Sequence, residues 1–280
     1  MRKIFWTLLL MGTAALAGAR EIKSVFMAGA AKAKMTPDVS NPAAPVWMAG
    51  YQGGRAATGV HDDLWITALA MRGDQGPALF ITVDLVGYLF DEVTRVKALI
   101  KKDLNVPPSR IFIFSTHDHS GPDAIGLWGK DGKTGKNQDY FDGLRGKIAA
   151  CAGEAVKNMK PARAVFGKIR YDNPIEDSRP PKVMNDLLLS MRVVDLEGKT
   201  IATLVNYAMH AEVLNGENTL ITSDYPGVLR ERLEKEYGGV GMFVPAAIGG
   251  MQSPFVLFHS FWSRGRVGKV VAEKAIESLA

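Results

Sequence analysis

Two histidines, His117 and His119, stand two positions apart in the run Ser115-Thr-His-Asp-His-Ser-Gly-Pro122. The preceding segment, 110–114, is apolar and β-rich, which predicts a buried strand. In extended backbone, residues two apart point the same way, so both imidazoles can reach one site. Such a pair can bind zinc, or one ring can hold or move a proton. The alternative is a polar loop with two solvated histidines.

Three further residues whose side chains could take part in catalysis or metal binding follow predicted strands: Asp84, His210 and Ser253. His210 lies far from His117 in the sequence, so the fold would have to bring the two together. A single histidine after a strand is more often structural than a ligand. Ser253 follows a Gly-Gly turn, as exposed nucleophiles do, but the segment is not Gly-x-Ser-x-Gly. Read alone, Ser253 is an ordinary turn serine.

The elements that would position these residues are an alternation of strands and helices. Segment 78–85 predicts a strand, 91–104 an amphipathic helix, and 110–114 a second strand, which together make a βαβ unit with parallel strands. Asp84 and His117 would then lie at the same sheet edge, where open α/β sheets bind ligands. The remaining segments complete the set: 64–71, 163–170, 187–195, 200–208 and 240–246 predict strands, and 140–159, 225–237 and 264–279 predict helices. We expect an α/β fold, a mixed β-sheet core with flanking helices.

The N-terminus has a different character from the rest of the chain. A basic Met1-Arg-Lys3 precedes an almost wholly apolar run to Ala17, and small residues follow. This pattern is typical of a secretory signal peptide, so we assign 1–19 to the signal and 20–280 to the domain. A short N-terminal membrane anchor is the alternative. The expected location is periplasmic or secreted.

Charge and cysteine content limit the kinds of partner and cross-link that the sequence suggests. The formal charge of +5 includes two basic residues of the signal, so the mature chain is mildly basic and no nucleic-acid partner is indicated. The chain has one cysteine, Cys151, so an internal disulfide is excluded. We expect Cys151 to be a small core residue. No obvious lipid-inserting element stands out.

Seven motifs occur together in one order. They are Met48-Ala-Gly-Tyr51, Gly59-Val-His-Asp62, Thr82-Val-Asp-Leu-Val-Gly87, the histidine run 115–122, Asn206-Tyr-Ala-Met-His210, Ser223-Asp-Tyr-Pro-Gly227 and Gly249-Gly-Met-Gln-Ser-Pro254. In this order they resemble the neutral/alkaline non-lysosomal ceramidases. The resemblance covers about residues 35–280, the N-terminal part of that catalytic domain.

The resemblance implies a zinc amidase that cleaves the N-acyl bond of ceramide or a related N-acyl lipid. By matching position, His117 and His210 correspond to zinc ligands, and His119 to a histidine that assists at the developing oxyanion. Arg179 corresponds to a functional arginine in a poorly matching segment. Ser253 corresponds to a serine that acts as nucleophile or positions the substrate. A lipid substrate also implies peripheral contact with a membrane surface.

Two departures from the family pattern leave an alternative open. Gly250-Met251 stands where the family has Gly-Asp, and the family's other zinc ligands, a Glu and a Tyr, lie beyond the serine motif, near which this sequence ends. Asp84 or Asp224 could supply a third ligand, or could orient a histidine. Either the domain 20–280 is a C-terminally incomplete fragment, or its metal site is incomplete. In the second case the rival hypothesis is a non-catalytic remnant or binding domain of the same fold.

Overall fold

The computed structural model describes residues 25–249 and 251–280. Its main strands are β1 (Met27–Lys34), β3 (Trp65–Gly73), β4 (Gly76–Val83), β5 (Ile111–Ser115), β6 (Lys160–Arg170), β8 (Leu187–Asp195), β9 (Thr200–Tyr207) and β11 (Val240–Pro245). They form one eight-stranded sheet in the order β11-β9-β8-β6-β1-β3-β4-β5. The helices are α1 (Phe90–Leu104), α2 (Gln138–Lys157), α3 (Asp224–Tyr237) and α4 (Phe261–Leu279), with a short 3-10 turn at Pro108–Arg110. The predicted mixed α/β fold is confirmed.

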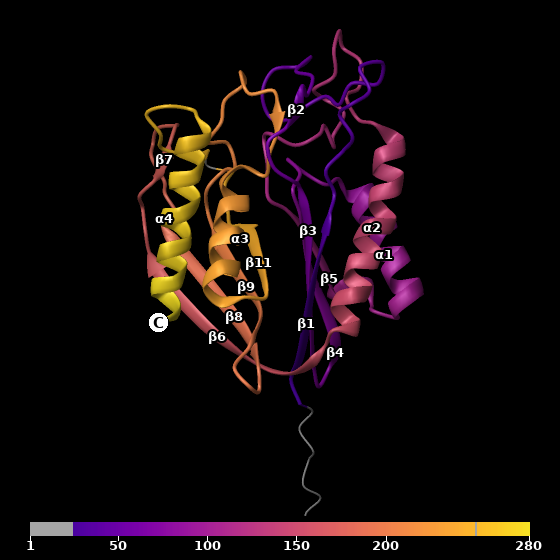
Figure 1. Ribbon diagram of the computed structural model, residues 1–280, viewed down its shortest axis with the longest axis vertical. Helices are drawn as coiled ribbons and strands as arrows, with labels where there is room; N and C mark the ends of the chain where they lie inside the picture. Colours follow the sequence, from indigo (N-terminus) through magenta and orange to yellow (C-terminus); the bar gives the residue numbers. More distant parts are fainter. Residues whose placement is uncertain (1–24, 250) are drawn as a thin grey trace, which may run out of the picture.

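The first half of the sheet contains β1, β3, β4 and β5, and α1 and α2 cover its outer face (Figure 1). Strands β4 and β5 are parallel, from Leu79 beside Ile111 to Val83 beside Ser115, and α1 connects them. The expected βαβ unit is therefore present. Helix α1 buries Val96 and Ile100 against the sheet, and it ends at Asn105, which adopts a left-handed conformation.

The second half contains β6, β8, β9 and β11, with α3 and α4 on its outer face (Figure 1). Strands β9 and β11 are parallel and are joined by α3, which makes a second crossover unit. Each half of the sheet therefore ends in a parallel pair whose carboxyl ends can carry functional loops.

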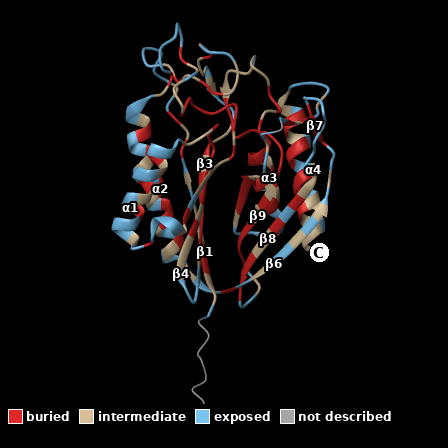
Figure 2. Cartoon of the chain, turned by 180° about the vertical axis from the view of Figure 1, so that it is seen from behind, coloured by how far each residue is buried: buried red, intermediate tan, exposed pale blue. Residues whose placement is uncertain are grey.

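The two halves meet as a folded sheet. Strands β1 and β6 pair at only two positions, Met27 with Pro161 and Ala28 with Lys160. A cluster of buried side chains that includes Leu69, Val193 and Met242 fills the space between the halves. The result is four layers, helix–sheet–sheet–helix. Strands β3 and β9 are largely buried, whereas β6 is mostly exposed (Figure 2).

Two small sheets cover the end of the molecule where β5 and β9 finish. Strand β2 (Gly59–Val60) pairs in parallel with β10 (Leu220–Ile221), and β7 (Ile175–Asp177) pairs antiparallel with β12 (Gln252–Pro254). These pairs join distant parts of the sequence above the main sheet.

The sequence did not predict strand β1, which lies at the centre of the sheet. Its composition, Met-Ala-Gly-Ala-Ala-Lys-Ala-Lys, lacks the β-branched and aromatic residues typical of strands. The structure explains the small residues, because α2 crosses close to this strand. A Cβ on Gly29 would lie 2.4 Å from the backbone oxygen of Ala155.

The assigned signal peptide, 1–19, lies outside the described residues. Among the residues that the structure describes, no helix has the length and hydropathy needed to cross a membrane.

Candidate metal centre

His117, His119 and His210 converge at the junction of the two halves. The ring centroids of His117 and His210 are 4.7 Å apart, those of His117 and His119 are 4.9 Å apart, and those of His119 and His210 are 5.8 Å apart. One nitrogen from each ring lies within 4.8 Å of the other two. His117 and His119 follow β5, whereas His210 follows β9, so both halves supply imidazoles to one cluster.

Backbone carbonyls fix the orientation of two of these rings. The Nδ1 atom of His117 donates to the Val86 carbonyl at 2.6 Å, and that of His210 donates to the Gln252 carbonyl at 2.9 Å. Each hydrogen bond leaves the Nε2 atom as the acceptor that a metal requires. His117 has a φ of 62°, a left-handed conformation that is uncommon for a side-chain-bearing residue.

His119 is held by its backbone and by close packing. Its amide donates to the Ala211 carbonyl at 3.0 Å, and its carbonyl accepts from Arg55 at 2.6 Å. The Tyr51 ring lies edge-on at 5.2 Å. Asp118 and Ala211 also form an isolated parallel bridge, so this short segment ties the histidine run directly to the chain after His210.

The surroundings of His117 and His119 favour the neutral form of both rings. Burial, together with the neighbouring His117 and His210 rings and Arg55, lowers the pKa of His119 to about 3. Burial and the His210 ring also hold the pKa of His117 below its ordinary value. Three imidazole nitrogens within this distance of one another could hold a divalent transition metal. His119, for which the sequence predicted a catalytic role, is thus placed as a third candidate ligand.

Ser253 lies beside this cluster, in contact with a carboxylate that the sequence did not single out. Its Oγ atom donates to Glu212 Oε1 at 2.5 Å. The other oxygen, Glu212 Oε2, lies 3.3 Å from His119 Nδ1, within ion-pair distance but without hydrogen-bond alignment. Glu212 therefore connects the serine to the histidines. The available sequence signal was its position two residues after His210, on the same side of an extended segment.

The two aspartates considered as metal ligands have other partners. The Asp84 carboxylate is fully buried and makes two bonds of 2.8 and 2.7 Å to Arg230. Asp224 accepts from the amides of Val213 and Leu214, which fixes the segment after His210. Both aspartates therefore position the chain around the histidines.

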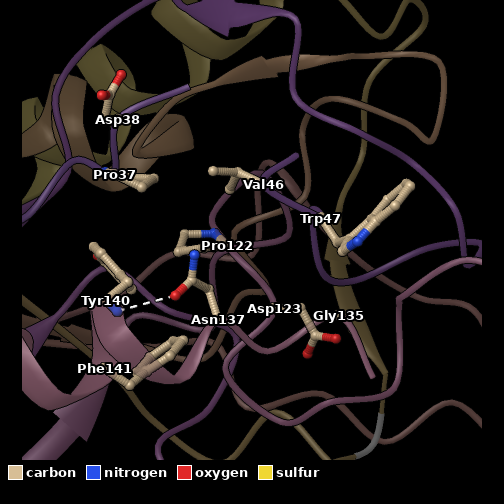
Figure 3. Close-up of a pocket in the computed structure, with 10 residues that line it drawn as sticks. All are labelled: Pro37, Asp38, Val46, Trp47, Pro122, Asp123, Gly135, Asn137, Tyr140 and Phe141. Carbon is tan, nitrogen blue, oxygen red and sulfur yellow. Dashed lines mark hydrogen bonds between the residues drawn. The ribbon is translucent and has the colours of Figure 1, made fainter. Parts of the chain in front are cut away.

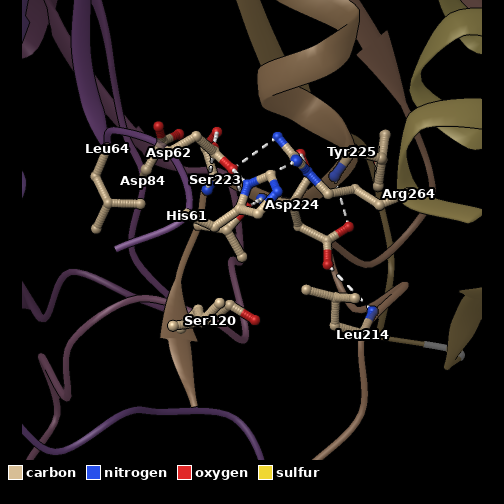
Figure 4. A network of polar contacts seen from close by, with 12 residues as sticks. His61, Asp62, Leu64, Asp84, Ser120, Leu214, Ser223, Asp224, Tyr225 and Arg264 are labelled. Carbon is tan, nitrogen blue, oxygen red and sulfur yellow. Dashed lines mark hydrogen bonds and ion pairs between the residues drawn. The ribbon is translucent and has the colours of Figure 1, made fainter. Parts of the chain in front are cut away.

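A polar network supports the start of α3 (Figure 4). Asp62 accepts from the Ser223 hydroxyl at 2.7 Å and forms an ion pair with Arg264 at 2.9 Å. Burial opposes ionisation of Asp62, but Arg264 and the neighbouring hydroxyls hold its pKa below the ordinary value. Ser223 stands at the N-cap position of α3, but its hydroxyl donates to Asp62 and does not cap the helix.

Arg179 has contacts in another segment. It is exposed, and its guanidinium donates to the Gly249 carbonyl at 2.9 Å. This bond connects the loop after β7 to the loop after β11, near the strand that carries Ser253. The functional role inferred for Arg179 from the family resemblance stays a prediction.

A cavity of about 180 Å³ adjoins Pro122 (Figure 3). Its walls include Trp47, Pro122, Asn137 and Tyr140, and Pro122 is the last residue of the run. The lining contains no histidine, so this cavity is separate from the metal centre.

The comparisons with known proteins point in one direction. No family model matches the sequence. The neutral ceramidase of Drosophila melanogaster is 26% identical over 236 residues, which cover 75% of this chain and 33% of that protein. Neutral ceramidase B of Dictyostelium discoideum is 24% identical over 229 residues, which cover 73% of this chain and 31% of that protein.

A solved structure extends the similarity to the fold. The neutral ceramidase of Pseudomonas aeruginosa superposes with a TM-score of 0.80 at 20% identity, covering 91% of this chain and 44% of that chain. The chain resembles part of a neutral ceramidase. The resemblance inferred from the motifs is thereby confirmed, and the mixed α/β sheet is that of the neutral ceramidases. The chain spans about a third of the length of the neutral ceramidases that it matches in sequence.

Proposed function

We propose that this chain hydrolyses the N-acyl bond of ceramide or a related N-acyl lipid, with zinc held by His117, His119 and His210. The observation that carries the proposal is the convergence of three imidazoles from both halves of the sheet. The similarity to neutral ceramidases supports the substrate class. A solved structure described as ceramidase complexed with C2 has the same fold, with a TM-score of 0.78.

Zinc at this position would supply Lewis-acid polarisation of the acyl carbonyl. The chain itself supplies the nucleophile and the proton acceptor. Ser253 presents its hydroxyl beside Glu212, so Glu212 can accept the hydroxyl proton as Oγ attacks the acyl carbon. The C–N bond then breaks, the amine leaves with a proton, and water releases the fatty acid from the serine ester. If Ser253 only positions the substrate, the same carboxylate can accept a proton from an attacking water.

The roles inferred from the resemblance enter the proposal with one change. His119 assists at the oxyanion in the family pattern, whereas here its ring is one of three that can hold zinc. Arg179 remains the proposed functional arginine. Its guanidinium donates to the carbonyl of Gly249. Gly249 lies three residues before Gln252, and the Gln252 carbonyl orients His210.

Release of fatty acid from a labelled ceramide in detergent micelles, with and without a chelator, tests this function. We expect release that the chelator abolishes and that added zinc restores. The His117→Ala variant is the matched control, because it removes a ligand and leaves Ser253 and Glu212 in place. Release that persists in the chelator would overturn the metal-dependent mechanism.

The non-catalytic alternative is a remnant or binding domain of the same fold with an incomplete metal site. It predicts no bound zinc after purification in zinc-containing medium and no turnover of any N-acyl lipid. About one zinc per chain supports the enzyme.

Export is part of the proposal and is tested separately. The apolar segment that we assign as a signal peptide implies a periplasmic or secreted protein. N-terminal sequencing of the exported chain would identify the first residue, which we expect close to residue 20.

A further inference from the structure

The loop between β12 and α4 exposes an unusual concentration of large apolar side chains. Phe255, Leu257, Phe258 and Trp262 are 56%, 80%, 73% and 71% exposed, respectively. The first three fall within four consecutive positions, and Trp262 lies in the first turn of α4. Single exposed apolar residues are ordinary, but a contiguous group marks an interaction surface.

A hollow beneath this loop separates it from the core. The hollow has a volume of about 490 Å³, and its walls include Tyr171, Pro174, Val267 and Val270 as well as the loop residues. Phe255, Leu257, Phe258 and Trp262 therefore line a depression and stay exposed, whereas Val256 packs against the core. We call this segment the apolar loop (residues 255–262).

Basic groups accompany the apolar loop. The Arg266 guanidinium lies 5.9 Å from the centroid of the Trp262 ring. Lys269 is exposed on the next turn of α4, and the first turn of that helix contains no acidic residue. Exposed aliphatic and aromatic side chains, with tryptophan and basic side chains beside them, are typical of protein surfaces that bind at a lipid–water interface. The positive charges are complementary to anionic headgroups.

The apolar loop is continuous with the candidate active site. Ser253 lies two positions before Phe255 in the sequence, and its hydroxyl contacts Glu212. The start of α4 lies at the same end of the molecule as β2 and β7 (Figure 1). His259, within the loop, donates from Nδ1 to the Val213 carbonyl at 2.8 Å, which fastens the loop to the segment after His210.

We propose that the apolar loop inserts its side chains into the surface of a lipid bilayer that carries anionic headgroups, with Ser253 and the histidine cluster held next to it. The substrate-related part of this inference rests on the proposed function, because an N-acyl lipid resides in such a bilayer. The contact with the bilayer stands on the loop alone. From the sequence alone, no obvious lipid-inserting element stands out.

A fluorophore at the loop tests the insertion directly. Cys151 is buried and is the one cysteine in the sequence, so a Leu257→Cys variant can be labelled selectively with an environment-sensitive nitrobenzoxadiazole group. We expect a blue shift and a rise in emission when phosphatidylcholine vesicles containing phosphatidylglycerol are added, and a smaller change without the anionic lipid. The fluorophore is placed on the loop because the apolar N-terminal segment could itself bind vesicles, and a probe on the loop reports only insertion of the loop.

A matched control stands at the other end of the sheet. Leu196 is 68% exposed and lies in the turn between β8 and β9, whereas His210 follows the opposite end of β9. The labelled Leu196→Cys variant should show no change with vesicles. In unlabelled protein, the double variant Leu257→Ser, Phe258→Ser should lower the vesicle partition coefficient by at least about tenfold.

Each outcome decides the inference independently of catalysis. No emission change at position 257, or an equal change at positions 196 and 257, would overturn it. A change at 257 that appears in concentrated protein without vesicles would also overturn it, in favour of self-association. Insertion without ceramide hydrolysis in micelles would leave the membrane contact standing and reject the proposed function.

Discussion

Ser253 and Glu212 share a hydrogen bond of 2.5 Å, although Ser253 lies on β12 and Glu212 on the segment that follows β9. The bond gives the serine hydroxyl an acceptor for its proton, and the second oxygen of the same carboxylate faces His119. A single carboxylate thus contacts both the serine and the histidine cluster.

The Glu212→Gln variant should lose turnover by about 10²- to 10⁴-fold, because an amide cannot accept the proton that the carboxylate accepts. Zinc content should be unchanged, because the ring nitrogens remain. Steady-state fatty acid release measures the loss, and Glu217→Gln, an exposed glutamate in the same loop, should retain full activity. Equal losses in both variants would indicate a general disturbance of the loop.

Metal retention should separate the histidines from the serine. His117→Ala should lose its zinc, because two remaining rings bind zinc weakly compared with three. Ser253→Ala should keep about one zinc per chain and lose turnover. Elemental analysis after dialysis gives the content, and loss of zinc from the Ser253 variant would refute this division of roles.

Gly50 should be required for the placement of His119. Gly50 has a φ of +102°, and a Cβ there would lie 2.5 Å from Cβ and Cγ of His119. Gly50→Ala should therefore weaken zinc affinity by about ten- to a hundredfold, the range for losing groups that orient metal ligands. Gly132→Ala is the control, because Gly132 also has positive φ but has no neighbour within 4 Å. Competition with a chelating dye would measure both affinities.

The metal-free protein should become less stable as the pH falls below 6.5, the ordinary pKa of histidine. The unfolded chain takes up a proton near that pH, whereas folded His119, with a pKa of about 3, does not. Stability is therefore unaffected above pH 6.5 and falls below it by about 1.4 kcal/mol per pH unit for each such histidine. Urea unfolding in a chelator gives the slope. His119→Gln should have a shallower slope, and an unchanged one would contradict the burial argument.

The Asp84–Arg230 ion pair should be important for folding. Arg230→Met leaves the fully buried Asp84 carboxylate without its cationic partner, which should cost about 3–5 kcal/mol in the free energy of unfolding. Arg232→Met on the same helix removes partly exposed pairs with Glu236 and Glu273, and should change stability little. Chemical denaturation of the two variants provides the comparison.

Much of the fold could be predicted from local patterns. The helical periodicity over 91–104, between two apolar strands, identified the crossover unit and placed His117 at its edge. Strand β1 could not be predicted, because its alanines and glycine are explained by the helix α2 that packs on them. Helix α4 begins at Phe261, earlier than expected, because the Ser260 side chain accepts from the Ser263 amide.

The site was predicted only in part. The family resemblance, and not spacing, paired His210 with His117. Glu212 was missed because its contacts with Ser253 and His119 depend on loops from different parts of the chain. The apolar loop was also missed, since the sequence 255–262 has the same composition as a buried strand, and only the structure shows its exposure.

The seam between β1 and β6 has a consequence for how the molecule is assembled. The halves share two residue pairs there, at the start of both strands, while His117 and His210 meet at the other end. An ion bound by both would cross-link the two halves of the sheet. Fragments divided between Met159 and Lys160 should then reassociate in a zinc-dependent manner, so that complementation would report occupancy of the centre without any substrate.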